Sequence, residues 1–167
     1  MLKKLNDACY NLKPMLDNCR WNGIIIDSEP PTITRIWTAY DGMKICLHKI
    51  YPSLNGVDEP FLHPHPWPCA TKILKGTYEM KMGRSTTLSP PSKLMPLVIS
   101  VGSSYEMSHE DMWHSINPID DIVYSIMLIG KKWDRKMPKK HVSPPRMLDK
   151  IEKEHLINEF SQLESLR

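Results

Sequence analysis

Apolar residues three or four positions apart mark the N-terminal segment of the chain. Their spacing over Leu2–Arg20 places them on one face of a helix: Leu2, Leu5, Cys9, Leu12, Leu16 and Cys19. Pro14 lies inside this pattern and is expected to divide it into two short helices, because proline lacks the N–H that a helix interior needs. We therefore predict a helical segment over residues 1–22 that packs on the outside of a sheet.

From Ile24 onwards the pattern changes to short runs that are rich in β-branched and aromatic residues and are bounded by turn residues. Asp41-Gly42 and Gly76-Thr77 each separate two such runs, so each predicts a hairpin. His48 lies within one run and is expected to be an ordinary packed or exposed strand residue. The runs predict about eight strands. They are Ile24–Asp27, Ile33–Tyr40, Met43–Tyr51, Ala70–Lys75, Tyr78–Met82, Leu97–Val101, Trp113–Asn117 and Ile122–Ile129.

Two segments lack periodicity and are predicted as connections: Arg84–Pro96 as a long polar loop and Gly102–Met112 as a turn and loop. Pro144–Arg167 carries an imperfect apolar stripe and is predicted to be helical. Many short strands between two helical ends indicate an all-β sandwich or barrel with helical additions. We expect one domain over residues 1–167, with the barrel over 24–135 and the C-terminal helix over 144–167.

Composition narrows the classes of function. Of the 167 residues, 41% are hydrophobic and 25% are charged, which is typical of an ordinary globular chain. The net charge of +3 does not indicate nucleic-acid binding; the basic segment Lys131–Lys140 is expected to be a surface loop, with docking of an anionic partner as the alternative. No apolar stretch is long enough to cross a membrane, and the N-terminus lacks the apolar core of a secretory leader. We expect a cytoplasmic protein with no nucleic-acid or membrane partner.

The four cysteines are not arranged in a CxxC pair, which excludes a zinc ribbon or a thioredoxin-type motif. The chemistry of the chain is expected elsewhere, at His63-Pro64-His65. Side chains alternate in an extended segment, so the two histidines point the same way and form half of a metal site.

This stretch resembles the first motif of the cupin superfamily, G-x5-H-x-H-x3,4-E-x6-G. After His63 and His65, Gly76 fits the final position, and Cys69 stands where the motif has glutamate. Gly56 is one residue further back than the leading glycine should be. The second motif, G-x5-P-x-G-x2-H-x3-N, is matched more loosely by Gly102–Asn117, in which the histidine, His114, is one place late.

The resemblance implies a cupin-type double-stranded β-helix, or jelly-roll barrel, in which His63, His65 and His114 bind one divalent metal ion. Three imidazoles suit Fe(II), which we favour, and also Ni, Zn, Mn or Cu. His109 is an alternative third ligand, although a solvent-exposed position is expected for it. Glu79 would reach the metal only if the strand register differed by one residue.

Cys69 makes the pattern similar to thiol dioxygenases, cupins in which three histidines bind Fe(II) and the glutamate ligand is missing. The thiol could act near the metal, bind it as a thiolate, or be a buried structural residue. We predict Cys69 and Tyr78 as catalytic residues, whereas Tyr124 comes too early on its strand to match the tyrosine that some of these enzymes cross-link to the cysteine. Arg35 is a candidate for the family's substrate-binding arginine.

The resemblance thus predicts a mononuclear non-haem Fe(II) dioxygenase that acts on a small molecule, with a thiol as one candidate. A metal-dependent isomerase, lyase or hydrolase of the same fold is the alternative, and a cupin that binds a small molecule without turnover is another. Other tyrosines, Tyr40 and Tyr105 among them, could serve as acids only if they face inward. Pairing into a homodimer is also compatible with this type of barrel.

Overall fold

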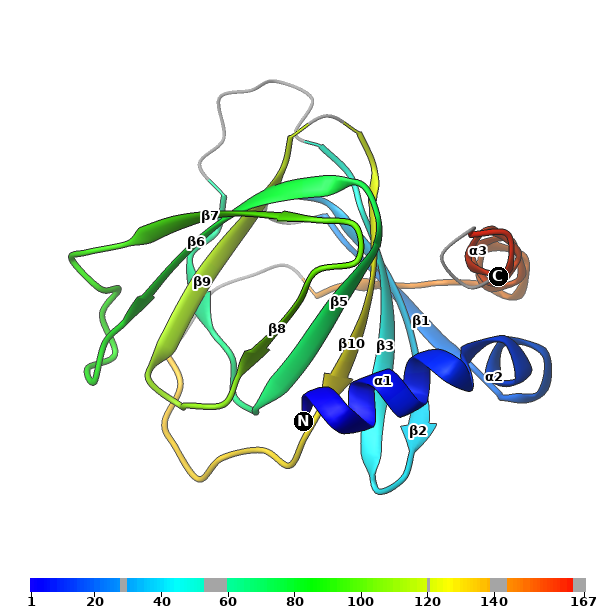
Figure 1. Ribbon diagram of the computed structural model, residues 1–167, viewed down its shortest axis with the longest axis horizontal. Helices are drawn as coiled ribbons and strands as arrows, with labels where there is room; N and C mark the ends of the chain where they lie inside the picture. The colour runs from blue at the N-terminus through cyan, green and yellow to red at the C-terminus, as the bar shows by residue number, and fades with distance from the viewer. Residues whose placement is uncertain (28–29, 53–59, 120, 139–143, 164–167) are drawn as a thin grey trace.

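Eleven strands and three helices make up the described part of the chain in the computed structural model (Figure 1). The structure describes residues 1–27, 30–52, 60–119, 121–138 and 144–163. The helices are α1 (Leu2–Tyr10), α2 (Leu12–Asn18) and α3 (Lys150–Ser161). The strands are β1 (Asn22–Ile26), β2 (Ile33–Tyr40), β3 (Met43–Ile50), β4 (His63–Pro64), β5 (Cys69–Lys75), β6 (Thr77–Arg84), β7 (Met95–Ser100), β8 (Ser104–Met107), β9 (Met112–Pro118), β10 (Val123–Ile129) and β11 (Arg146–Met147).

The strands form two sheets whose described pairings are all antiparallel. The seven-stranded sheet has the order β11-β1-β2-β3-β10-β5-β8, and the four-stranded sheet has the order β4-β9-β6-β7. The two sheets curve around a common interior, with β6 and β7 extending away from it as an arm (Figure 1). The predicted all-β architecture with helical additions is confirmed.

The helices cover the outer face of the seven-stranded sheet, as predicted for the N-terminal segment (Figure 1). Leu5 and Ala8 of α1 and Phe160 of α3 are completely buried in one cluster with outward-facing side chains of β2, β3, β5 and β10. β10 lies in the middle of this sheet and is buried on both faces, which explains why its residues are apolar apart from Ser125 and the hydroxyl of Tyr124. Its alternate residues face the helices on one side and the barrel interior on the other.

The division of the N-terminal segment was predicted at the wrong residue. The two helices separate at Asn11, whose backbone adopts φ −90° and ψ 1°, and not at Pro14. Pro14 is the third residue of α2, where the backbone N–H has no partner within the helix, so its absence costs little. The side chain of Asn11 donates instead to the carbonyl of Asp7 and caps the end of α1.

The C-terminal helix is shorter than predicted. It begins after Asp149, which forms a capping box with Glu152, because each side chain accepts from the backbone N–H of the other. The preceding residues, Arg146 and Met147, pair with β1 as a short strand. Residues 164–167 of the predicted helix lie outside the described residues.

The predicted hairpin at Asp41-Gly42 is confirmed. β2 and β3 pair from Ile33↔Ile50 to Tyr40↔Met43, which leaves a two-residue turn. Both turn residues have positive φ angles, 46° and 70°, and this is the signature of a type I′ hairpin turn.

The predicted hairpin at Gly76-Thr77 is wrong. β5 pairs with β10 and β8, whereas β6 pairs with β9 and β7, so the chain crosses from one sheet to the other at Gly76. Gly76 has a φ of 82°, and a Cβ there would lie 2.9 Å from the carbonyl oxygen of Ile122. The glycine between the two strand-like runs therefore marks the point at which the chain passes from one sheet to the other, and not a hairpin turn.

Two predicted loops contain strand structure. Gly102–Met112 includes β8, and Arg84–Pro96 is shortened because β6 extends to Arg84 and β7 begins at Met95. β7 and β8 are edge strands, each paired on one side only within the described residues. Edge strands are partly solvent-exposed, so they lack the regular alternation that identifies a strand in a sequence.

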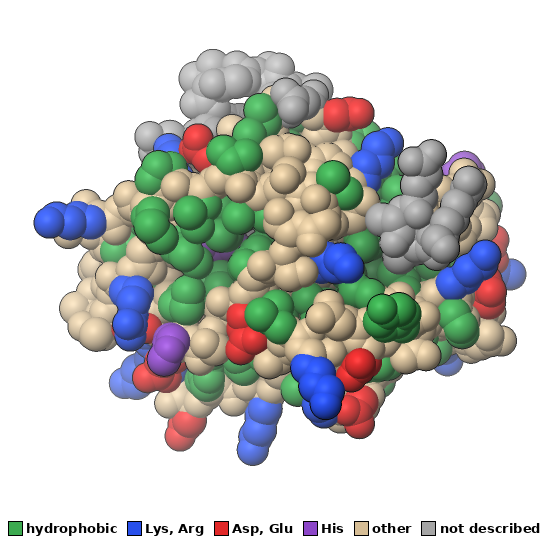
Figure 2. All heavy atoms as spheres, viewed as in Figure 1, with side chains coloured by type: hydrophobic (Ala, Val, Ile, Leu, Met, Phe, Trp, Pro, Cys, Tyr) green, Lys and Arg blue, Asp and Glu red, His purple; other side chains and the backbone are tan. Residues whose placement is uncertain are grey.

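Exposed hydrophobic side chains occur along the arm, where Met95 and Val98 of β7 are 54% and 68% exposed. On the face shown in Figure 2, hydrophobic side chains cover much of the central area, and charged side chains of both signs are interspersed mostly toward the periphery. Within the described residues, no helix combines the length and the apolar character that crossing a membrane requires.

Candidate metal centre

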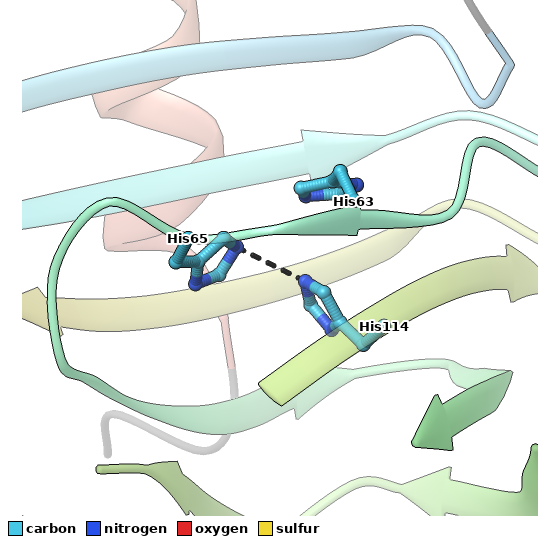
Figure 3. Close-up of side chains that lie close together, drawn as sticks. All are labelled: His63, His65 and His114. Carbon is cyan, nitrogen blue, oxygen red and sulfur yellow. Dashed lines mark hydrogen bonds between the residues drawn. The ribbon is translucent and has the colours of Figure 1, made fainter. Parts of the chain in front are cut away.

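Three histidines converge inside the barrel (Figure 3). β4 pairs with β9 so that His63 lies directly opposite His114, and His65 follows β4 by one residue. One ring nitrogen from each histidine lies within 4.8 Å of the others. The chain therefore brings together the three residues that the motifs selected, from two strands about fifty positions apart (His65 and His114 differ by 49).

Hydrogen bonds determine which ring nitrogens are available. The Nδ1 atom of His63 lies 3.0 Å from the carbonyl oxygen of Phe61, which can only accept, so this nitrogen carries the proton. The Nε2 atom of His63 is thus left with its lone pair. The Nδ1 atom of His65 lies 3.0 Å from the Sγ atom of Cys69, and its Nε2 atom lies 3.0 Å from the Nε2 atom of His114. Such outer contacts hold metal-binding imidazoles in the required orientation.

The protonation state of the site suits metal binding. Burial lowers the pKa of His63 from its usual value of 6.5 and lowers the pKa values of His65 and His114 well below it. The three rings are therefore neutral at neutral pH, and a neutral imidazole is the form that binds a metal.

The distance between two of the ring nitrogens also fits a metal ion. Two nitrogens that bind one ion at about 2.1 Å, at right angles to each other, would lie about 3 Å apart. The separation between the Nε2 atoms of His65 and His114 is 3.0 Å. The other ring nitrogen of His114, Nδ1, is buried without a hydrogen-bond partner among the described residues, and it would not contact an ion held by Nε2. These residues could hold a divalent ion.

The two alternative ligands do not join this group. His109 is exposed and lies beside Asp111 and Arg135, in a shallow surface groove. The side chain of Glu79 is 43% exposed and lies 3.9 Å from the amine of Lys81, so it faces away from the interior. In the described structure, the third histidine beside His63 and His65 is His114 and not His109.

Cys69 lies directly beside the histidines and is completely buried. Burial raises the pKa of its thiol to about 12, so the sulfur is protonated at neutral pH. Its polar contact with the site is to the Nδ1 atom of His65, on the opposite side of that ring from His114. Tyr124, the tyrosine considered as a partner for this cysteine, faces the helices and donates to Glu159 at 3.0 Å.

The histidines form part of the wall of a cavity of about 330 Å³. This volume is typical of a site for a small molecule. The wall is mostly apolar, and none of the described residues that line it is acidic. It is lined by Ile26, Pro30, Pro31, Ile33, Arg35, His48, Ile50, Phe61, His63, His65, Thr71, Tyr78, Tyr105, His114, Ile116, Ser125, Met127 and Pro145.

Two tyrosines lie on this wall. Tyr78 of β6 is 1% exposed and donates a hydrogen bond of 2.8 Å to the hydroxyl of Tyr105 on β8. Burial raises the pKa of Tyr78 well above its usual value of 10 and raises the pKa of Tyr105 to about 12, so both remain protonated. Tyr78 faces inward, as its predicted role requires. The sequence did not show whether Tyr105 does, because β8 was predicted to be a loop.

Arg35 and His48 form a polar pair on the same wall. They lie opposite each other on β2 and β3, and the Nε–H of Arg35 donates to the Nε2 atom of His48 at 2.7 Å. The sequence suggested Arg35 but gave His48 no functional role. The alternation of β3 was the available signal, because His48 shares an inward face with Cys46.

Comparisons with known proteins give information on the fold. No family model matches the chain, and no curated protein matches it in sequence. Among solved structures, hydroxypropylphosphonic acid epoxidase from S. wedmorenis is similar with a TM-score of 0.51 and 12% identity, over 70% of this chain and 57% of the epoxidase. A structure of Fe(II)-HppE with the alternative substrate (S)-1-HPP gives a TM-score of 0.51 and 11% identity, over 70% of this chain and 58% of that one.

This chain therefore spans somewhat more than half the length of these proteins. At such low identity the similarity shows the fold alone. The predicted cupin-type β-barrel with helical additions is confirmed at that level.

Proposed function

We propose that this protein is a metal-dependent enzyme in which His63, His65 and His114 bind one divalent ion and a small molecule occupies the adjoining cavity. The observation that carries the proposal is the convergence of three neutral imidazoles, His114 buried and His63 and His65 partly buried, on the wall of that cavity. Shielding the nitrogens of three neighbouring rings from water is unfavourable unless these nitrogens find partners. A shared cation would supply that partner.

Fe(II) is the metal we favour, and a mononuclear non-haem dioxygenase is the activity. A set of three imidazoles without a carboxylate suits iron, and one of the structures with this fold is described as containing Fe(II). When bound, iron would supply Lewis acidity and one-electron chemistry with O2. Ni, Zn, Mn and Cu remain compatible with the same nitrogen donors.

The residues around the histidines have distinct tasks in this proposal. Cys69 accepts the Nδ1–H of His65 and so directs the Nε2 lone pair of that ring toward the ion. The hydroxyl of Tyr105, which already accepts from Tyr78, keeps its own proton and can donate it to a polar group of the substrate. The apolar side chains of the wall limit the access of water.

Arg35 indicates the kind of substrate. It is a cation on a cavity wall to which the described residues contribute no acidic side chain, so an anionic group on the substrate would be a suitable partner for it. We therefore propose a small anionic substrate, with an anionic thiol as one candidate. Metal-dependent isomerisation, elimination or hydrolysis of a small anion is the second candidate, because the same residues could polarise a carbonyl without consuming oxygen.

Metal analysis and oxygen uptake test this proposal together. The purified protein is loaded with Fe(II) under anaerobic conditions, and bound iron is measured for wild type, His114→Ala and the matched control His109→Ala. We expect about one iron per chain in wild type and in His109→Ala, and a large loss in His114→Ala. Iron retained by His114→Ala would contradict the proposed centre.

Oxygen consumption is then measured with a panel of small anionic thiols and with the matching alcohols. Uptake that depends on both iron and one of these compounds supports the dioxygenase. Tight iron binding without oxygen uptake across the panel would favour the non-redox alternative. If the folded protein binds no metal, the result would favour the remaining alternative, a cupin that binds a small molecule without turnover.

A further inference from the structure

His48 does more than fill the interior beside Arg35. It is only 5% exposed, and it lies opposite Arg35 in the register of β2 and β3. Ser125 of β10 lies opposite His48 on its other side, so a polar row crosses three neighbouring strands of a mostly apolar wall. His48 and Ser125 are buried and Arg35 is partly buried, and polar groups in such positions are normally hydrogen-bonded.

The direction of the hydrogen bond defines the state of His48. Arg35 can only donate, so the Nε2 atom of His48 must offer a lone pair. Burial and the adjacent guanidinium hold the pKa of His48 well below 6.5, so the ring is neutral. His48 thus binds Arg35 without neutralising its charge, and no carboxylate among the described residues forms an ion pair with Arg35.

The bond also selects one edge of the guanidinium. A guanidinium can hold a two-oxygen anion by its terminal edge, through both Nη atoms, or by its side edge, through Nε and one Nη atom. His48 already occupies the Nε–H, which removes the side edge. The Nη atoms donate no hydrogen bond to the described residues.

We infer that His48 is a positioning residue that holds Arg35 by its Nε–H and so presents the terminal edge of the guanidinium to a planar, two-oxygen anion such as a carboxylate. This inference rests on the proposed function, because it assumes that Arg35 receives an anionic group of the substrate. It adds the chemical class, a carboxylate, and the residue that imposes the selection.

The test uses butanoate and its neutral counterpart butanamide as probes. Their dissociation constants are measured by NMR titration for wild type and for His48→Leu, which keeps an apolar side chain but removes the acceptor. His48→Gln is the conservative variant, because its amide oxygen can still accept the Nε–H of Arg35. Tyr124→Phe is the matched control, since it removes a polar group from the outer face of the adjacent strand.

We expect butanoate to bind wild type more tightly than butanamide, and His48→Leu to weaken butanoate binding about tenfold with little change for butanamide. His48→Gln and Tyr124→Phe should stay within about twofold of wild type. In protein labelled with ¹⁵N-arginine, the slowly exchanging Nε–H signal that disappears in Arg35→Lys should persist in His48→Gln and exchange rapidly in His48→Leu.

Two results would overturn the inference. One is unchanged butanoate binding in His48→Leu, and the other is an equal loss for butanoate and butanamide, which would indicate general damage to the cavity. The titrations are repeated with metal-free protein, so that the effect of His48 on butanoate binding is measured independently of the metal centre. Selective binding of butanoate that depends on His48 in a protein that binds no iron would refute the proposed enzyme and retain the positioning role.

Discussion

Gly76→Ala tests the feature that most distinguishes this fold from the predicted hairpin, the crossing between the two sheets. Gly76 connects β5 to β6 with a φ of 82°, a conformation that side chains with a Cβ rarely adopt. An added Cβ would lie 2.9 Å from the carbonyl oxygen of Ile122 and 3.1 Å from a methyl group of Val123. Val123 is the buried first residue of β10 and Ile122 directly precedes it, so neither neighbour can move freely.

Three effects of this substitution on the free energy of unfolding can be estimated, two that lower it and one that raises it. The positive φ costs alanine about 1–2 kcal/mol, and forcing an extra carbon against packed atoms costs about 1–3 kcal/mol. Alanine also restricts the unfolded chain, which returns about 0.4–1 kcal/mol. We therefore predict that Gly76→Ala lowers the free energy of unfolding by about 3 kcal/mol.

Gly102→Ala is a control that isolates the packing part. Gly102 has a φ of 84°, almost the same as that of Gly76, but apart from its chain neighbours no atom of the described residues lies within 4 Å of the position of its Cβ. It should lose only about 1 kcal/mol, so the two variants should differ by about 2 kcal/mol. Urea unfolding followed by tryptophan fluorescence measures both free energies, and equal losses would refute the proposed close approach to Ile122.

Three further predictions concern the site and its support. Cys69→Ala should weaken iron binding about 10–100-fold, because the Nδ1 atom of His65 loses its partner. Competition with a chelator measures this affinity, and Cys69→Ser should restore part of it. Unchanged affinity in Cys69→Ala would show that the thiol does not orient His65. Phe160→Ala should lower the free energy of unfolding, measured by urea unfolding, by about 3–5 kcal/mol, because the ring is completely buried and packs edge-on against Tyr124. A loss below about 1 kcal/mol would mean that α3 is not needed to cover the sheet. Glu152→Gln should lower the free energy of unfolding at pH 7, because hydrogen bonds from Arg146 and from the backbone of Asp149 lower the pKa of Glu152 to about 2. The difference in this free energy from wild type should shrink as the pH falls from about 4.5 toward 2. A difference that is independent of pH in urea unfolding would refute this account.

The sequence predicted those parts of the protein that depend on local spacing. The positions of His63, His65 and His114 followed from motif spacing, and the structure brings the three rings together. The β2–β3 hairpin followed from Asp41-Gly42, because this turn requires two positive φ angles in succession.

The errors arose where partners are set by the whole fold. Gly76 gives the same local signal whether the next strand folds back or joins the other sheet, and only the pairing of β6 with β9 decides between them. β8 was missed because it is a short edge strand, and with it the inward position of Tyr105.

His48 could not be assigned for a related reason. Its importance comes from the register that places it opposite Arg35, and register is not contained in the spacing of a single strand.

The most direct test of the account is a crystal structure of the iron-loaded protein with diffraction data recorded on both sides of the iron absorption edge. We predict one strong anomalous peak per chain, about 2.1 Å from a ring nitrogen of each of His63, His65 and His114, on the wall that also carries Arg35. A peak at another group of residues, or iron that is present in the crystal but absent from the three histidines, would contradict the metal centre on which the proposed function depends.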